Sequence, residues 1–460
     1  MYYYKLISLN QSQSQQGLSF NLATGNLIEL NGKRVSLGVV PNQTKSNLAS
    51  NELPDIVVIP EYFIGNISLM GVFFLAVMSS AQKKTPMTIV VTDKIMKERL
   101  ITYMEEGFRP NIMKHLDTLN ISEEDRVFLK NEYEYFDQAE RSVDEMMTII
   151  TMEDCDLDIK REGADYYIGG RKYFTSDIKP IDIGGLKPLP PWTPTFGVLT
   201  VGNTSGAYGH APATNLIVRY NAEETSRSLW IDCGPQMREL AMSAGENIES
   251  IDLVLTHGHE DHDVGIWDLL LDQRCKRINL ITHLIYADSF FKKAKALNLL
   301  DRAKEKVILT ELSPRNATSS QRTTLQIHGL NIQAEWAVHG MPTISLKIQK
   351  DGKTFIYTSD TAVSSERIST LLKSGAMTDK RVHQLQDFFM IPHCDLFIEE
   401  MGAMLLDGEH RGGVNHNNSL DTIKPNHIGI HRVVHWNAAN KDMIPPTIKA
   451  PYMEPITIIH

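Results

Sequence analysis

Residues 256–262 carry the feature that most constrains this chain, because three histidines and one aspartate fall within six positions. The apolar run at residues 251–255 before them is typical of a buried strand, and a helix is expected to begin near Ile266. Imidazole and carboxylate groups at this density suit a borderline divalent ion such as Zn²⁺. The alternative is a polar loop that is merely rich in histidine. We interpret the segment as a metal-binding loop where a strand ends and a helix begins.

The spacing within this loop divides its four ligands between two ions. His257 and His259, two residues apart, can face one ion, and Asp261 and His262, past the turn, can face a second. The pattern His-x-His-x-Asp-His resembles the signature of the metallo-β-lactamase-fold hydrolases, and further elements match downstream in that family's order. The resemblance implies an α/β (α+β) fold, the αββα sandwich, with the metal loop at one edge of it.

The resemblance also implies further site residues, each following an apolar strand. Asp232 matches an aspartate that supports the metal loop from behind, and His339 matches the third ligand of the first ion. Asp360, in a strand-Ser-Asp-Thr element, matches the aspartate that bridges both ions, about 3.5–4 Å apart. His283 and His328 compete with His339, but each sits within or beside an apolar run. We interpret these two histidines as structural.

Two histidines compete for the last ligand of the second ion. His435, in Val-Val-His-Trp, fits the family pattern better than His431, in Ile-Gly-Ile-His. Strand alternation would put His431 on the same face, just behind the ligand. The expected first ion is therefore held by His257, His259 and His339, the second by Asp261, His262 and His435, with Asp360 as the bridge.

The residue that would donate a proton matches the family pattern less well than the metal ligands do. Many relatives have a histidine in a His-Glu-Ala segment, proposed as the proton donor, whereas this chain has Glu399 there, followed by Glu400. His416 resembles a second histidine that relatives carry nearby, and it is the substitute candidate. The resemblance therefore implies Asp261, His416 and Glu400 as catalytic residues, with Asp232 and His431 behind the ligands.

A bridging aspartate and five histidines resemble the phosphodiesterase and tRNase Z-like branch more than the β-lactamase branch. The resemblance implies a water between two ions as the nucleophile, with Zn²⁺ expected and Mn²⁺ or Fe as alternatives. Residues 339–346 and 357–361 resemble a subgroup often fused to cyclic-nucleotide-binding modules. The branch resemblance implies a phosphodiester substrate, and a small cyclic nucleotide is expected rather than structured RNA because the acidic balance disfavours RNA. The rivals are a thioester or lactone hydrolase, an RNase Z-like ribonuclease, and a metal-stabilised scaffold or binding protein.

Charge and cysteine usage bear on partners and compartment. The formal net charge of −10 disfavours non-specific binding to RNA or anionic lipid. Four scattered cysteines without a CxxC pair favour a reducing compartment. The N-terminus lacks the features of a signal peptide, and the apolar run at residues 67–81 is too short to span a bilayer. We expect a cytoplasmic enzyme with a small-molecule phosphodiester substrate and no membrane association, and a homodimer is compatible with this.

A proline-rich segment, residues 186–196, divides the chain, because four prolines at this density cannot continue a helix or a central strand. Residues 1–185 contain a single histidine, His115, whereas residues 197–460 contain the other fifteen. The sequence therefore predicts an N-terminal domain, a linker and a C-terminal catalytic domain.

The two halves resemble distant copies, since residues 17–28 align without gaps beside 206–217, and 55–65 beside 252–262. In that register the positions of the four loop ligands are taken by Pro60, Tyr62, Ile64 and Gly65. We predict a degenerate metallo-β-lactamase-like domain without metal ligands that packs against the second half. Chance similarity between two β/α segments is the alternative. Residues 121–165 have no counterpart, and their acidic, helix-prone sequence predicts a solvated face.

Overall fold

The computed structural model places most of the second half and about half of the first. The residues it describes are 27–37, 54–59, 76, 79, 84–108, 113, 116–139, 143–163, 165–173, 189, 191–203, 213–223, 225–318, 321–401, 423–435, 448–449 and 453–459. Among these, no helix is both long enough and apolar enough to cross a bilayer.

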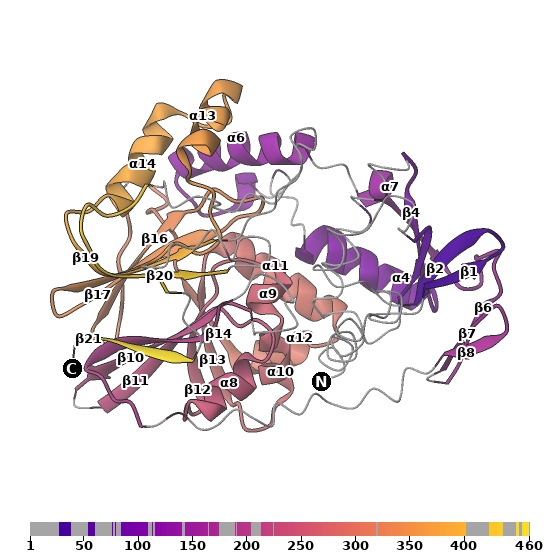
Figure 1. Ribbon diagram of the computed structural model, residues 1–460, viewed down its shortest axis with the longest axis horizontal. Coiled ribbons are helices and arrows are strands. Elements are labelled where there is room, and N and C mark those ends of the chain that lie inside the picture. The colour runs from indigo at the N-terminus through magenta and orange to yellow at the C-terminus, as the bar shows by residue number, and fades with distance from the viewer. Residues whose placement is uncertain are drawn as a thin grey trace.

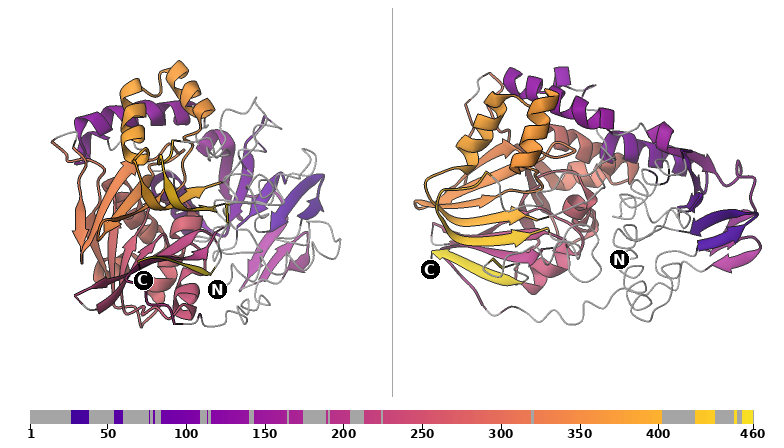
Figure 2. Two further views of the ribbon diagram at one scale, coloured as in Figure 1. Left: turned by 60° about the vertical axis from the view of Figure 1, so that its left-hand side comes forward. Right: turned by 45° about the horizontal axis from the view of Figure 1, so that its top comes forward.

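The second half is built on two sheets that lie face to face (Figures 1 and 2). The first has the order β14-β13-β12-β11-β10-β9-β21, formed by Val307–Glu311, Arg277–Thr282, Ser250–Val254, Thr225–Ile231, Asn215–Ala222, Phe196–Gly202 and Glu454–Ile459. The second has the order β15-β16-β17-β18-β19-β20, formed by Leu325–Ile327, Leu330–Trp336, Ile344–Lys350, Lys353–Tyr357, Cys394–Glu400 and Ile428–Val434.

Successive side chains of a strand point to opposite faces of its sheet. They form three apolar layers: one between the two sheets, and one between each sheet and its helices. Leu216 and Val218 of β10 join the core between the two sheets, together with Leu346 and Phe355 from β17 and β18. Ile217, between the first two, faces the opposite way, toward the helices of the first sheet. These helices are α8 (Met237–Ser243), α10 (Gly265–Leu271), α11 (Leu284–Ala296) and α12 (Leu300–Lys306).

The second sheet is covered by α13 (Ser365–Ser374) and α14 (Asp379–Phe389), which pack on Ile356 and Phe397. Local capping sets the ends of α13: the Ser364 side chain accepts a hydrogen bond from the Arg367 backbone N–H, and Gly375 ends the helix with a left-handed φ of 76°. With helices outside both sheets, the predicted αββα sandwich is confirmed.

The first half repeats part of this architecture. Its sheet has the order β1-β2-β3-β4-β5, in which the first pair is antiparallel and the rest are parallel. β10 to β14 have the same order and the same strand directions. The five strands are Leu27–Leu30, Lys33–Leu37, Ile56–Val58, Met87–Val91 and Met147–Thr151.

An antiparallel three-stranded sheet follows in the first half, formed by β6 (Ile159–Glu162), β7 (Asp165–Ile168) and β8 (Arg171–Tyr173). It takes the place in chain order that β15 to β17 take in the second half. The repeated strand order confirms the duplicated architecture for these sheets. Residues 60–65, aligned with the metal loop in the sequence, lie outside the described residues.

The expectation that residues 121–165 form a solvated face is wrong for α6 (Glu123–Ala139). This helix lies beside α13 and α14 of the second half (Figure 1). Phe128, Leu129 and Tyr133 extend the core between the sheets, and the side chains of Asp125 and Glu132 are buried. The acidic residues were misleading because they meet buried arginines rather than water.

Those arginines form a buried ion cluster around Glu335 of β16. Its carboxylate receives hydrogen bonds from Arg315 at 2.9 Å, Arg322 at 2.8 Å and Arg381 at 3.1 Å. Burial alone would raise the pKa of Glu335, but the three guanidinium groups hold it below its usual range. On the α6 side, Arg315 Nη1 lies 2.5 Å from Asp125 Oδ1. The cluster therefore ties α6 to the sandwich.

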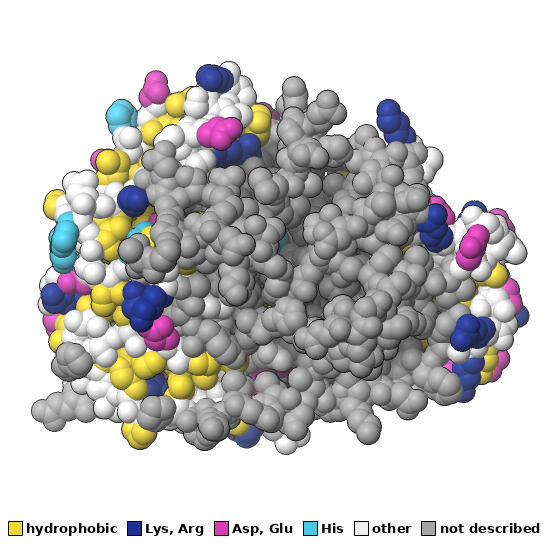
Figure 3. All heavy atoms as spheres, viewed as in Figure 1, with side chains coloured by type: hydrophobic (Ala, Val, Ile, Leu, Met, Phe, Trp, Pro, Cys, Tyr) yellow, Lys and Arg dark blue, Asp and Glu magenta, His cyan; other side chains and the backbone are white. Residues whose placement is uncertain are grey.

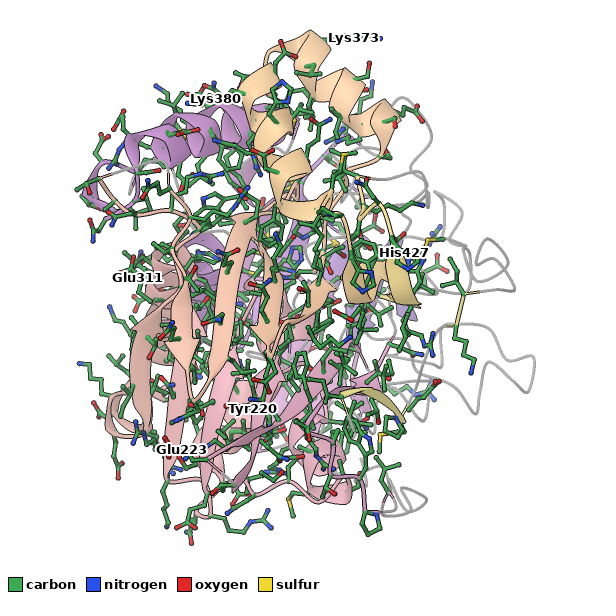
Figure 4. All side chains as sticks on the ribbon, turned by 90° about the vertical axis from the view of Figure 1, so that its left-hand side faces the viewer. Tyr220, Glu223, Glu311, Lys373, Lys380 and His427 are labelled. Carbon is green, nitrogen blue, oxygen red and sulfur yellow. The ribbon has the colours of Figure 1, made fainter. Side chains whose placement is uncertain are left out.

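The periphery of the same interface carries exposed pairs. Figure 4 shows Lys380 beside α6, where its Nζ lies 3.2 Å from Glu124 Oε1. Such exposed pairs contribute about 0–1 kcal/mol each.

We expect Glu335→Ala to destabilise the second half by about 3–5 kcal/mol, because it leaves the buried guanidinium groups of Arg315 and Arg381, and the partly buried one of Arg322, without their shared carboxylate. All five tryptophans follow residue 190, so intrinsic fluorescence during urea unfolding reports on the second half. Glu123→Ala is the control, since Glu123 is 80% exposed in its pair with Arg126 and should change stability by less than about 0.5 kcal/mol. Equal midpoints for the two variants would contradict the role of the cluster.

Candidate metal centre

The metal loop begins where β12 ends at Val254 and runs into the short helix α9 (Glu260–Asp263). Four further segments reach the same place, each shortly beyond the end of a strand: Asp232 after β11, His339 after β16, Ser359 after β18 and His435 after β20. Asp232, Ser359 and His435 have left-handed backbones, with φ of 63°, 53° and 57°. Non-glycine residues seldom adopt this conformation, and it clusters at functional sites.

Three histidines and one carboxylate form the first ligand group. The Nδ1 atom of His259 lies 3.1 Å from Nε2 of His257 and 3.0 Å from Nε2 of His339. Oδ2 of Asp360 lies 3.7 Å from Nε2 of His257 and 3.9 Å from Nε2 of His339. The four ligand atoms all lie within 4.8 Å of one another. The sequence-predicted ligands of the first ion are therefore brought together.

Asp261, His262 and His435 form the second group, also within 4.8 Å. Oδ2 of Asp261 lies 3.3 Å from Nε2 of His435 and 3.9 Å from Nε2 of His262. The carboxylate of Asp360 reaches this group as well, with Oδ1 3.3 Å from Nε2 of His262 and Oδ2 3.4 Å from Nε2 of His435. Asp360 therefore lies between the two groups, as the sequence predicts for a bridge.

The chemistry of the donor set fits bound cations. Imidazole nitrogens 3.0 to 3.1 Å apart converge on one place, and each unprotonated ring nitrogen has a single lone pair that it can give to a metal ion. Nitrogen and carboxylate oxygen are ligands that Zn²⁺ takes in proteins. The described residues therefore offer two groups that can hold metal ions.

The charges at the centre also favour bound cations. Burial, with His262 nearby, keeps the pKa of His257 well below its usual range, so this ring is neutral. Burial also opposes charge on Asp360, yet His435 and His262 hold the pKa of its carboxyl well below the usual range. Burial disfavours the charged form of His435, but Asp360 and Asp261 outweigh it and raise its pKa to about 10. The carboxylates are ionised, and positive charge beside them is favoured.

Hydrogen bonds from behind fix the ligands. Oδ2 of Asp232 lies 2.8 Å from Nδ1 of His262, and its Oδ1 accepts from the Thr256 backbone N–H at 2.9 Å and hydroxyl at 2.8 Å. The same hydroxyl lies 3.0 Å from Nδ1 of His257. Tyr357 donates to Asp232 Oδ2 at 3.3 Å. Asp232 lies behind the ligands, as expected. The supporting roles of Thr256 and Tyr357 were not predicted from the sequence, although Thr256 directly precedes the first ligand.

The proposed catalytic residues fall in different places. Glu400 is buried behind His435, with Oε2 3.5 Å from Nδ1 of that ring, so it orients a ligand. His431 is placed differently from the expectation: its Nε2 faces Glu399 at 3.2 Å and its ring packs on Phe397. His431 and His435 do not follow the expected strand alternation, because the backbone of His435 is left-handed and this residue lies beyond the end of β20. His416 lies outside the described residues.

The two competing histidines lie apart from the ligand groups. His283 caps α11 by accepting from the Tyr286 backbone N–H at 3.2 Å, and burial lowers its pKa to about 3. His328 is partly exposed, 3.8 Å from Asp252. Both fit the structural role predicted for them.

Comparisons with known proteins match part of this chain. Residues 197–389, less than half of the chain, match the family described as anti-Pycsar protein Apyc1. The matched range contains every residue of the two ligand groups except His435. Two relatives from Dictyostelium discoideum are similar to this chain. cGMP-dependent 3′,5′-cGMP phosphodiesterase A is 27% identical over 200 residues, covering 43% of this chain and 21% of the relative.

The second relative, cAMP/cGMP-dependent 3′,5′-cAMP/cGMP phosphodiesterase B, is 28% identical over 159 residues, covering 35% of this chain and 14% of the relative. The match thus spans less than a quarter of either relative. Among solved structures, human tRNase Z, short form, aligns with a TM-score of 0.40 and 13% identity, over 57% of this chain and 100% of that one.

We expect Asp232→Asn to lower metal affinity about 10- to 100-fold, because it weakens the hydrogen bonds that orient His262 and the backbone of Thr256. Competition with a chromogenic chelator measures this. Asp252→Asn is the matched control, since Asp252 accepts from Asn279 at the same sheet but touches no ligand of the two groups. Unchanged affinity in Asp232→Asn would show that the loop holds its ligands without this support.

His435→Ala should lower the number of ions bound per chain, whereas His431→Ala should leave it unchanged, because His431 contacts Glu399. Elemental analysis of the purified variants gives the count. If His431→Ala loses more metal than His435→Ala, the assignment of the last ligand is wrong.

Proposed function

We propose that this chain is a metal-dependent phosphodiesterase that hydrolyses a small cyclic nucleotide and holds two divalent ions, Zn²⁺ before Mn²⁺ or Fe. The observation that carries the proposal is the place of Asp360, whose carboxylate lies between two groups of buried ligands. A shared carboxylate suits a pair of ions acting on one phosphoryl group.

Two ions held there would activate a water and neutralise the charge that develops on phosphoryl oxygens. Burial of the ligands and two nearby carboxylates would support this chemistry. Six of the seven ligands are buried and only His259 is partly exposed, so the centre opens on the side of His259. Asp261, whose Oδ2 lies 3.3 Å from Nε2 of His435, is the carboxylate that we assign as acceptor of a proton from an attacking water. Glu400 acts behind His435, by orienting it.

The choice of a cyclic nucleotide rests on the two phosphodiesterase relatives and on charge. On the face seen in Figure 3, the described Lys and Arg side chains are interspersed with Asp and Glu rather than gathered in a basic patch. Together with the net charge of −10, this favours a small anionic substrate over structured RNA. Within this proposal, residues 197–460 are the catalytic domain, 186–196 the linker, and 1–185 a copy without metal ligands.

The test is turnover of the metal-loaded full chain on cyclic mononucleotides, bis-p-nitrophenyl phosphate, thioesters and lactones. We expect phosphodiester hydrolysis, and Asp360→Ala should lower it by more than about 10²-fold, since this removes the carboxylate shared by both groups. Asp288→Ala, in an exposed helical pair with Lys292, is the control and should keep full activity.

Two results would contradict the proposal. Turnover of thioesters or lactones without turnover of phosphodiesters would assign the centre to a different bond. A chain that is loaded with metal and turns over none of these substrates would be a metal-stabilised binding protein.

A further inference from the structure

The residues of the metal loop that are not ligands contact other parts of the protein, and these contacts hold the loop in place. Gly258, Glu260 and Asp263 stand between or beside the ligand positions, and all three are buried. Their partners come from two helical segments: α11 of the second half, and a π-helix of the first half, η4 (Thr102–Phe108). Figure 1 shows the preceding helix α4 (Lys94–Ile101) next to α11.

Lys293 of α11 supplies one set of contacts. Its side chain is fully buried, and its Nζ donates to the Gly258 carbonyl at 2.5 Å and to Asp263 Oδ2 at 2.6 Å. Tyr286 donates to the same carboxylate oxygen at 3.0 Å. Glycine suits position 258, because a Cβ there would lie 3.1 Å from the Tyr286 ring, which is a tight contact. These bonds anchor both ends of the ligand segment.

Tyr103 of η4 supplies the contact in the middle. Its hydroxyl donates to Oε1 of Glu260 at 3.1 Å, and both side chains are buried. Its ring lies 5.6 Å from Nζ of Lys293, within cation–π range. Burial and the nearby carboxylates of Glu260 and Asp263 keep the pKa of Tyr103 well above its usual range, so the hydroxyl keeps the proton that it donates.

The backbone of η4 is shaped for this approach. A Cβ on Gly107 would lie 2.6 Å from Cγ of Lys293, so glycine permits the π-helix to touch α11. Ser289 of α11 donates to the Gly107 carbonyl, and Arg99 of α4 donates to the Ala296 carbonyl at 2.7 Å. π-Helical turns are rare and occur frequently at functional sites. This one delivers a tyrosine of the first half to the metal loop.

We propose that Tyr103 is a positioning residue of the metal centre, supplied by the first half, which fixes Glu260 and through it the adjacent ligands His259 and Asp261. The inference rests on the metal centre of the proposed function. Removing the hydroxyl takes one hydrogen-bond donor from a buried carboxylate, which costs free energy and loosens the short segment that carries both ligands.

A thermodynamic consequence follows from this contact. If docking of residues 94–108 orders the loop, then metal binding must stabilise that docking by the same free energy. The first half then contributes to metal affinity although its own copy of the fold carries no ligand in these groups.

Tyr103→Phe in the full chain tests the proposal, because it removes one hydroxyl and keeps the ring. We expect Zn²⁺ affinity, measured against a chromogenic chelator, to fall about tenfold, and the visible spectrum of the Co²⁺-loaded protein to change. Tyr135→Phe is the matched control: Tyr135 belongs to α6 of the same half and contacts Arg367 of α13. It should leave affinity and spectrum unchanged.

Glu260→Ala distinguishes positioning from general damage. In that background Tyr103→Phe should cause no further loss, because its partner is gone. Equal losses in both backgrounds, or a Tyr103→Phe protein with wild-type affinity and spectrum, would overturn the role of Tyr103 while leaving the proposed function standing. A wild-type chain that binds neither Zn²⁺ nor Co²⁺ would overturn both proposals.

Discussion

The carboxylate of Asp360 lies between two groups of buried ligands, and the layout of the second half follows from holding it there. A buried carboxylate is costly unless positive groups and hydrogen bonds compensate it. Nε2 of His262 and Nε2 of His435 lie 3.3 and 3.4 Å from its oxygens. Since these residues follow strands of different sheets, the sheets must face each other with those strand ends at one edge. The core that packs the sheets therefore also sets the distances between ligands.

The parts of this centre that could be predicted are those that local sequence determines. The metal loop carries four ligands in six residues, and Asp232 and Asp360 each end an apolar strand in a recognisable turn. The roles of Glu400 and His431 could not be predicted, because they depend on a left-handed backbone at His435 that no strand pattern reveals. In the same way, Asp125 and Glu132 of α6 are buried beside arginines that come from distant segments.

Contacts between the two halves could not be predicted either, because they join residues that are far apart in the sequence. Tyr103 and Glu260 are separated by 157 positions, and neither stands in a motif that links them. The predicted duplication does explain why such contacts exist. A copy of the sheet with the same strand order has kept its core, and α4, η4 and α6, which follow its fourth strand, lie against the second half. The first half thus packs against the metal loop and the sandwich.

Two ions that share Asp360 would be visible by anomalous diffraction from crystals of the Zn²⁺-loaded chain. We expect two peaks about 3.5–4 Å apart. One should lie among His257, His259 and His339, the other among Asp261, His262 and His435, with the carboxylate of Asp360 between them. A single peak, or a peak in the first half of the chain, would contradict this expectation.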